Sequence, residues 1–276
     1  MKKVDPKLYT KEYYLSECSG YNEYIKYKGN ILEIRLKKAL EIANVNKEKT
    51  VLDIGCGRGE IVVACAKNGA KAIGIDYSKD ALELANDVAA QQLPEIKKNI
   101  TFIHNEATNV PFQDKMFDVV FLLDVVEHLY PDELDITMRN IYRILKDDGI
   151  MIIHTYPNTL FIKIIYKYWY RPLKILLNIT QGRKEGCPEK EFETDYTRIM
   201  HVNEQSFYSL KKILINNNFK CKYIPWPEEV GINNLQNNLK NIILKKLIIT
   251  YRLLFLNWPL KIIFSNHIWV KATKNK

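Results

Sequence analysis

Residues 50–60 place glycines at three alternate positions directly behind an aliphatic run. Gly55, Gly57 and Gly59 follow Asp53 at the end of that run, and a helical pattern comes after them. This order is typical of a buried parallel strand, a tight turn and a helix N-terminus. Glycine accepts positive φ and lets a ligand approach the backbone, and free helix N–H groups favour electron-rich ligand groups. The segment therefore predicts a ligand-binding turn.

Acidic residues stand at the ends of the strands that follow. Asp76, Glu106 and Asp124 each end or follow an aliphatic run. Ligands of parallel sheets bind outside the carboxyl ends of the strands, so one site can collect these carboxylates, and Asp76 stands where a ribose would lie. The turn spacing GxGxG differs from the GxGxxG fingerprint of dinucleotide-binding proteins, which disfavours a nicotinamide dehydrogenase.

Strands and helices alternate through the middle of the chain. Alternation at this spacing predicts a parallel sheet that is covered by helices on both faces. We expect strands near 50–55, 71–76, 100–105, 117–123 and 149–155, and helices near 59–68, 79–91 and 132–145.

The ordered series resembles the class I S-adenosylmethionine (SAM)-dependent methyltransferases, above all the ubiquinone- and menaquinone-biosynthesis type and its relatives that act on small molecules and saccharides. The resemblance covers about residues 30–157 well and 200–226 loosely. It implies an α/β fold with a Rossmann-like, doubly wound sheet of seven strands, in which strands six and seven form an antiparallel pair. It also implies that SAM is consumed, that S-adenosylhomocysteine is released, and that no metal is required.

The resemblance assigns roles around the methyl donor. Asp76 would accept both ribose hydroxyls, Tyr77 would pack on adenine, and Glu106 would accept the adenine amino group. Asp53 would anchor the turn or the methionine ammonium group. The cofactor-binding residues implied in this way are Asp53, Gly55, Cys56, Gly57, Gly59, Asp76, Tyr77, Glu106, Ala107, Asp124 and Val125.

Candidate catalytic residues are fewer and their roles stay open. His128 follows the fourth strand, and a neutral imidazole can act as a general base near neutral pH. The sequence Glu-His-Leu is common in family members with different acceptors, so His128 is either a base or a structural residue. Tyr14 is either a lid aromatic or an ordinary packing residue. His201 is expected to open a helix and either to line the pocket or to cap that helix. His154 is expected to be a buried, hydrogen-bonded histidine.

The chain divides into four expected parts. Insertions interrupt the second half of the sheet, where resembling enzymes place the acceptor. A helix is expected from near 203 to 218, a sixth strand over 219–226 and a seventh over 262–272. The parts are an N-terminal helical lid over 1–49, a SAM-binding core over 50–157, a basic amphipathic insertion over 158–202, and the rest of the core over 203–276 with a helical insertion over 228–260.

Charge is unevenly distributed along the 276 residues. The net charge is +9, yet residues 158–276 alone carry +12 and residues 1–157 carry −3. Such asymmetry favours an anionic partner or surface. In an expected helix over 160–179, four cations fall within an arc of about 80° and the rest of the circumference is apolar. These are Lys163, Lys167, Arg171 and Lys174. The helix either lies on the inner face of an anionic membrane or covers the acceptor pocket.

Five cysteines without metal-site spacing indicate reduced thiols in a cytoplasmic protein, and the polar first ten residues show no secretory signal. The leading function is methyl transfer to a small-molecule acceptor, expected at a hydroxyl of a saccharide or related metabolite. An anionic or lipid-linked acceptor would suit the basic half of the chain. The alternatives are a nucleic-acid methyltransferase, which lacks its usual motif after the fourth strand here, and a noncatalytic SAM-binding scaffold. A homodimer is compatible with the sequence.

Overall fold

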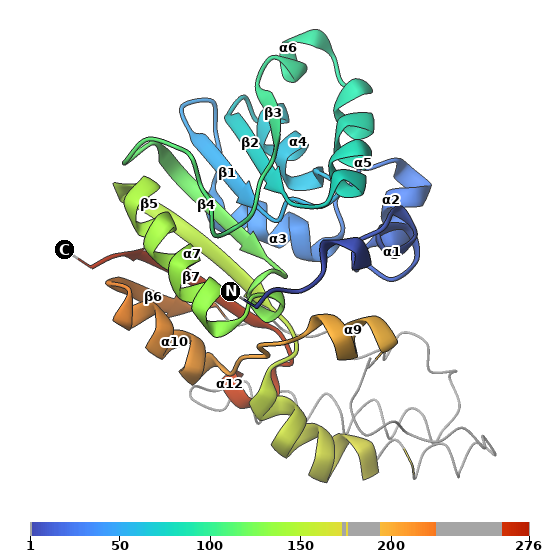
Figure 1. The fold of residues 1–276 in the computed structure, drawn as a ribbon, viewed down its shortest axis with the longest axis vertical. Helices are drawn as coiled ribbons and strands as arrows, with labels where there is room; N and C mark the ends of the chain where they lie inside the picture. Colours follow the sequence, from blue (N-terminus) through green and yellow to red (C-terminus); the bar gives the residue numbers. More distant parts are fainter. Residues whose placement is uncertain (1, 173–174, 176–193, 225–260, 276) are drawn as a thin grey trace, which may run out of the picture.

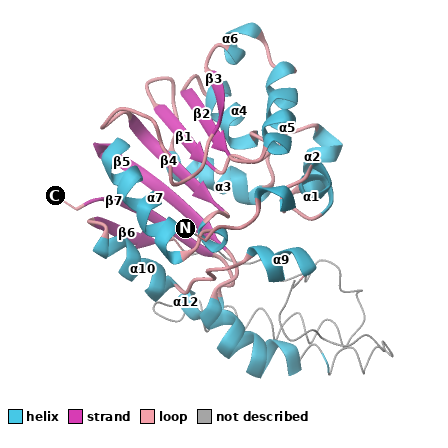
Figure 2. Cartoon of the chain, in the orientation of Figure 1, coloured by secondary structure: helices cyan, strands magenta, loops and turns pink. Residues whose placement is uncertain are grey.

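A seven-stranded sheet organises the described part of this computed structural model, which comprises residues 2–172, 175, 194–224 and 261–275. The strand order is β3-β2-β1-β4-β5-β7-β6 (Figures 1 and 2). The pairs among the first five strands are parallel, and β7 runs antiparallel to both β5 and β6. The expected fold is thereby confirmed. The strands are β1 Thr50–Ile54, β2 Lys71–Asp76, β3 Ile100–His104, β4 Phe117–Leu123, β5 Leu145–Thr155, β6 Phe219–Tyr223 and β7 Ile268–Lys274.

Helices lie on both faces of the sheet (Figure 2). None of the helices in the described ranges is long and apolar enough to cross a membrane. The helices are η1 Pro6–Leu8, α1 Lys11–Ser16, α2 Tyr21–Tyr27, α3 Ile34–Ala43, α4 Glu60–Lys67, α5 Lys79–Ala90, α6 Pro94–Lys97, η2 Val126–His128, α7 Pro131–Ile144, η3 Phe161–Tyr170, α9 Asp195–Met200, α10 Phe207–Asn216 and α12 Lys261–Phe264.

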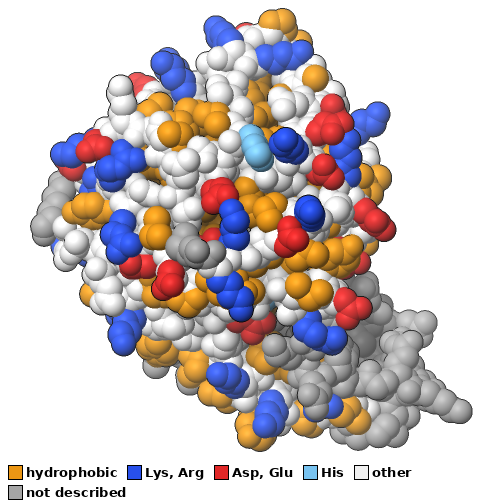
Figure 3. Space-filling view, viewed as in Figure 1, with side chains coloured by type: hydrophobic (Ala, Val, Ile, Leu, Met, Phe, Trp, Pro, Cys, Tyr) orange, Lys and Arg blue, Asp and Glu red, His pale blue; other side chains and the backbone are white. Residues whose placement is uncertain are grey.

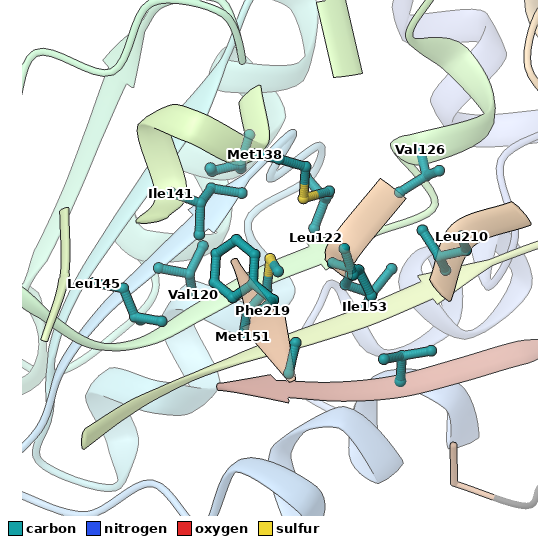
Figure 4. Packing of buried hydrophobic residues seen from close by; sticks show 14 of the residues in the cluster. Val120, Leu122, Val126, Met138, Ile141, Leu145, Met151, Ile153, Leu210 and Phe219 are labelled. Atoms are coloured by element: carbon teal, nitrogen blue, oxygen red, sulfur yellow. The ribbon is translucent and has the colours of Figure 1, made fainter. Parts of the chain in front are cut away.

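The central strands are apolar on both faces because both faces are covered. Along β4, Val120 and Leu122 pack toward α7 and α10, whereas Val119 and Phe121 pack toward α3 and α4. Successive side chains of a strand point to opposite faces, so one strand contributes to two cores. Figure 4 shows the first of these cores, in which Met138 of α7 lies among the strand residues. This double burial fixes the strand ends relative to one another.

Several boundaries differ from those expected. The helix expected from near 203 begins at Phe207, because the Ser206 hydroxyl accepts a hydrogen bond from the Ser209 N–H at 3.0 Å and caps α10 there. The seventh strand begins at Ile268, since α12 occupies the start of its expected range. His201 does not open a helix: it ends α9, a helix absent from the expected elements, with its N–H donating to the Thr197 carbonyl.

The second expected insertion, 228–260, lies outside the described residues, as does Lys174. Of the first insertion, η3 and α9 are described. The expected division into four parts stays a prediction.

Candidate functional site

A cavity of about 580 Å³ lies at the carboxyl ends of β1, β2, β4 and β5. Its lining comes from the strand ends, from the N-terminal segment and from α9, which contributes Tyr196 and Met200. A volume of this size is typical of sites that enclose a small organic ligand. The parallel strands thus bring their carboxyl ends to one cavity, as the sequence predicted.

The glycine turn after β1 requires glycine for steric reasons. Gly55 and Gly57 have φ of +71° and +50°, and a Cβ on Gly55 would lie 2.5 Å from Cγ2 of Val125. Both glycines line the cavity, as predicted. The cavity lining does not include Gly59: it precedes α4, and a Cβ there would lie 2.6 Å from the ring of Phe102. Gly59 therefore supports the packing of the turn, and its expected role in cofactor binding stays a prediction.

Asp76 ties the turn after β1 to the end of β2. Its Oδ2 accepts the Gly57 N–H at 2.9 Å, and its Oδ1 accepts the Ser78 N–H at 2.8 Å. The side chain is buried, and burial raises the pKa of Asp76 to about 6, although the two N–H donors act in the opposite direction. Each carboxylate oxygen has a second lone pair with which it could accept a ligand hydroxyl.

The remaining expected donor-side residues also line the cavity: Asp53, Cys56, Tyr77, Glu106, Ala107, Asp124 and Val125. Burial, with the charge of Asp76, raises the pKa of Asp53 well above its usual range. Glu106 accepts a hydrogen bond from Lys3 Nζ at 2.6 Å. The N-terminal segment thus contacts the residue that is expected to accept a hydrogen bond from the adenine amino group.

The three expected catalytic residues lie in the same cavity. His128 Nδ1 lies 2.9 Å from the hydroxyl of Tyr9, and the His128 ring also forms a hydrogen bond with the backbone of Met200. Burial and the nearby His201, whose ring centroid is 4.9 Å away, lower the pKa of His128 to about 3. Tyr14 is buried and packs over Gly57.

Three residues at the end of the cavity near β5 and β7 were not predicted from the sequence: Arg35, Glu127 and His267. Arg35 of α3 pairs with Asp124, and Nε2 of the fully buried His154 lies 2.9 Å from Nδ1 of His267. His154 Nδ1 in turn bonds Asp124, which confirms His154 as a buried, hydrogen-bonded histidine. Glu127 is also buried, and burial raises its pKa to about 7 although Thr155 donates to it at 2.8 Å. The residue types of Arg35, His267 and Glu127 carry no local signal of these contacts.

Glu127, His128 and His201 bring groups of the metal-ligand type within 4.8 Å of one another. Thr155 and Tyr9 already bond the first two of these groups. The sequence-based expectation of a metal-free reaction stays a prediction.

The sequence of this chain is similar to those of known proteins. A methyltransferase-domain family model matches residues 52–153. The ubiquinone biosynthesis O-methyltransferase of Actinobacillus pleuropneumoniae serotype 7 is 30% identical over 199 residues, which span 69% of this chain and 84% of that protein. The chain belongs to the class I SAM-dependent methyltransferases.

Two more distant similarities are one in sequence and one in structure. The demethylmenaquinone methyltransferase of Staphylococcus saprophyticus is 27% identical over 140 residues, spanning 49% of this chain and 57% of that protein. The YcgJ protein of Bacillus subtilis, a solved structure, is 19% identical with a TM-score of 0.53, covering 87% of this chain and 98% of that one. The structural likeness shows the fold.

SAM is the methyl donor that the family implies, and the residues of this methyltransferase fit it. Because Gly57 has no side chain, the cavity edge there has space for a ligand. A Cβ at this position would fill that space and touch Tyr14 at 3.4 Å. Asp76 offers paired oxygens at the end of β2, and the buried carboxyl of Asp53 faces the same cavity. A cationic donor with a ribose and an ammonium group would complement these two acids.

Proposed function

We propose that this enzyme transfers the methyl group of SAM to a hydroxyl of a small metabolite, a saccharide or related compound. One observation carries the proposal: the cavity continues past the glycine turn and Asp76 to a second end that holds His154, Tyr156 and His267. The first end suits the donor, and the second end, which is lined by imidazole and hydroxyl groups, suits an acceptor that carries hydroxyls.

The residues proposed to hold the donor act through position and charge. Asp76 would bind the ribose hydroxyls, Asp53 the ammonium group, and Tyr77 the adenine face. Glu106, which already accepts from Lys3 through one oxygen, would accept the adenine amino group through a remaining lone pair. Much of the rate of such an in-line transfer can come from holding the two reactants in the correct geometry, because this removes translational and rotational freedom before the reaction.

His128 is proposed as either a base or a positioning residue, and its contacts favour the second role. Tyr9 comes from the N-terminal segment and Met200 from α9, and both bond His128. These two elements cover the cavity, so His128 would hold its cover in place. Tyr14 would line the donor end, and His201 would pack on His128.

A nucleic-acid acceptor is the alternative function. A cavity of about 580 Å³ has the size of a small-molecule site, which favours a small acceptor. On the face of the molecule in Figure 3, acidic and basic side chains are interspersed over the described residues, unlike the continuous basic stripe of a nucleic-acid surface.

The experiment is transfer of labelled methyl groups from SAM to polar, lipid and RNA extracts by the purified protein. Label in a small polar or lipid-linked product supports the proposal. Label confined to RNA would contradict it, and binding of SAM without any labelled product would favour the scaffold alternative.

We further propose that η3 contacts an anionic membrane surface or a lipid-linked acceptor. Ile164, Tyr168 and Trp169 are 41%, 65% and 61% exposed, and Lys163 and Lys167 are exposed on the same helix. Apolar and aromatic groups between cations suit a helix that lies at a membrane interface.

A further inference from the structure

Two parts of the chain that are far apart in the sequence cover the same cavity. The first, which we call the N-terminal cover, comprises residues 3–19, and the second is α9; side chains of both line the cavity. One apolar cluster contains Tyr9 and Tyr14 of the N-terminal cover together with Met200 of α9. The two covers are therefore packed against each other.

The N-terminal cover lies over the donor end of the cavity. The hydroxyl of Ser78 donates to the carbonyl of Tyr9 at 2.7 Å, and the ring of Tyr9 lies 5.1 Å from that of Tyr77. Tyr14 packs over Gly57 of the glycine turn. A donor that is held at the glycine turn and at the end of β2 would lie beneath this cover, and its binding would restrict the motion of the cover.

The helix α9 is held beside the ends of β4 and β5. Directly after α9, the N–H groups of Val202 and Asn203 donate to the carbonyl of Glu127 at 2.9 and 3.1 Å. The side chain of Glu127 in turn accepts a hydrogen bond from Thr155 of β5 at 2.8 Å. These bonds place α9 toward the end of the cavity where the acceptor is proposed to bind.

His128 connects the two covers. Its Nδ1 lies 2.9 Å from the hydroxyl of Tyr9, and its ring also forms a hydrogen bond with the backbone of Met200, the last residue of α9. The rings of Tyr13 and Tyr196 make a second contact between the covers, with centroids 5.5 Å apart. Hydrogen bonds are directional, whereas apolar contacts are not, so His128 is the contact that sets the position of one cover relative to the other.

We propose that His128 couples the two covers, so that binding of the methyl donor under the N-terminal cover fixes α9 over the acceptor end. The acceptor then meets a cover that the donor has already ordered. This inference rests on the proposed function. In this role His128 is a positioning residue, because it acts through the covers and not on the reacting atoms.

Coupling of this kind is reciprocal. If donor binding restricts α9, a change that loosens α9 must weaken donor binding. The change can then lie on the outer side of α9, away from any ligand. Ile199 offers such a position, since its side chain is 59% exposed and does not line the cavity.

The first test is hydrogen exchange of the free protein, measured by mass spectrometry on peptides from the two covers. Tyr9→Phe keeps the ring and removes one hydroxyl. It should speed exchange in residues 3–19 and also in residues 195–203, because amide exchange follows local opening. The matched control, Tyr208→Phe, removes an exposed hydroxyl from α10 and should change neither. Unchanged exchange of residues 195–203 in Tyr9→Phe would overturn the coupling.

The second test repeats this measurement with S-adenosylhomocysteine, whose binding is followed by calorimetry. In the wild type, the compound should slow exchange in both covers by at least about fivefold, the lower range of coupling between two sites. In Tyr9→Phe and in His128→Phe, the slowing should persist in residues 3–19 and be lost in residues 195–203. Slowing of the N-terminal cover alone in the wild type, or of both covers in His128→Phe, would refute the role of His128.

The third test uses the exposed position on α9. Ile199→Gly weakens the helix, whereas Ile199→Ala also removes the side chain but favours the helix. Affinity for S-adenosylhomocysteine should be lower in the glycine variant by up to about fivefold, the ratio that the difference in helix propensity allows. When Tyr9→Phe is added to both variants, the two affinities should become equal.

Equal affinities of the two Ile199 variants with Tyr9 in place would contradict the coupling. Absence of S-adenosylhomocysteine binding by the wild type would instead refute the proposed function. Hydrogen exchange of the free protein would still decide whether His128 couples the covers.

Discussion

The hydroxyl of Tyr9 lies 2.9 Å from Nδ1 of His128, although 119 positions separate the two residues in the chain. Tyr9 also packs on Tyr77, with ring centroids 5.1 Å apart. The N-terminal segment is thereby tied to both the end of β2 and the residues after β4. Since Tyr77 and His128 both line the cavity, the segment covers the site as an integral part of it.

This contact should be measurable as a coupling energy. Tyr9→Phe and His128→Phe keep the rings and remove the polar atoms of the bond. We expect each change to destabilise the fold and the pair to be non-additive by about 0.5–1.5 kcal/mol, the usual net value of a hydrogen bond. Urea unfolding of the four proteins in the double-mutant cycle gives the value, with the exposed Tyr208→Phe as a control. Strictly additive effects would show that the bond contributes nothing.

Arg58 should anchor the same segment. Its guanidinium donates to the carbonyls of Tyr14 and Ser19 at 2.7 and 2.8 Å, and it forms a buried pair with Glu60. Arg58→Met leaves Glu60 as an uncompensated buried charge, so we expect a loss of about 3–5 kcal/mol and faster hydrogen exchange over residues 9–19.

The matched control for Arg58 is Arg139→Met. Arg139 pairs with Asp135 on the surface, where the two side chains are 63% and 45% exposed. Exposed pairs contribute little, so this variant should stay within about 0.5 kcal/mol of the wild type. Equal stability of the Arg58 and Arg139 variants would contradict the anchoring role.

Glu127 should make stability fall as the pH rises. Burial raises its pKa from 4.5 to about 7, so the folded state keeps a proton that the unfolded state has already lost. Its contribution is fully present below about pH 4.5 and is lost as the pH rises through about 7, by at most about 1.4 kcal/mol per pH unit. The stability of the wild type relative to Glu127→Gln should therefore fall between pH 5 and 7.5. Denaturant unfolding at the two pH values checks this, and the exposed Glu95→Gln should show no such trend. A constant difference would mean that Glu127 ionises normally in the fold.

Local patterns predicted the donor side of the site well. Each of Asp53, Asp76 and Asp124 stands at the end of an aliphatic run, and a parallel sheet brings such ends together without further information. The strand-end residues Gly55, Asp76, Glu106 and Asp124 could therefore be placed in one cavity from the strand pattern.

The acceptor side could not be predicted in this way, because its contacts join distant segments. His154 and His267 are 113 positions apart, and they meet because β7 pairs with β5 in a register that places His154 opposite Trp269. An insertion separates these strands in the chain, and no short pattern encodes the register across it. The helix α9, which ends at His201, begins at a capping Thr194 that the loop-like composition concealed.

Membrane contact should depend on salt and on the cations of the first insertion. Each basic residue near an anionic bilayer contributes roughly 1 kcal/mol at physiological salt. We expect the wild type to sediment with anionic vesicles at low salt, less at high salt, and not with zwitterionic vesicles. A variant in which the four cations of this insertion are replaced by glutamine should lose binding to the vesicles. A control variant in which four exposed lysines elsewhere in the chain are replaced by glutamine should keep most of that binding. Equal, negligible sedimentation of all three proteins would eliminate the membrane proposal. The two sets are Lys163, Lys167, Arg171 and Lys174, and Lys47, Lys71, Lys97 and Lys98.

Calorimetric titration with SAM and with S-adenosylhomocysteine tests the central claim, that one cavity at the strand ends holds the methyl donor. The wild type should bind both compounds at a single site. Asp76→Asn keeps the shape of the side chain but loses its charge and one acceptor oxygen, so affinity should fall by about 1–3 kcal/mol, while Asp87→Ala on the exposed side of α5 should bind as the wild type does. Circular dichroism confirms that each variant is folded. Absence of binding by the folded wild type, or full affinity in Asp76→Asn, would contradict the claim.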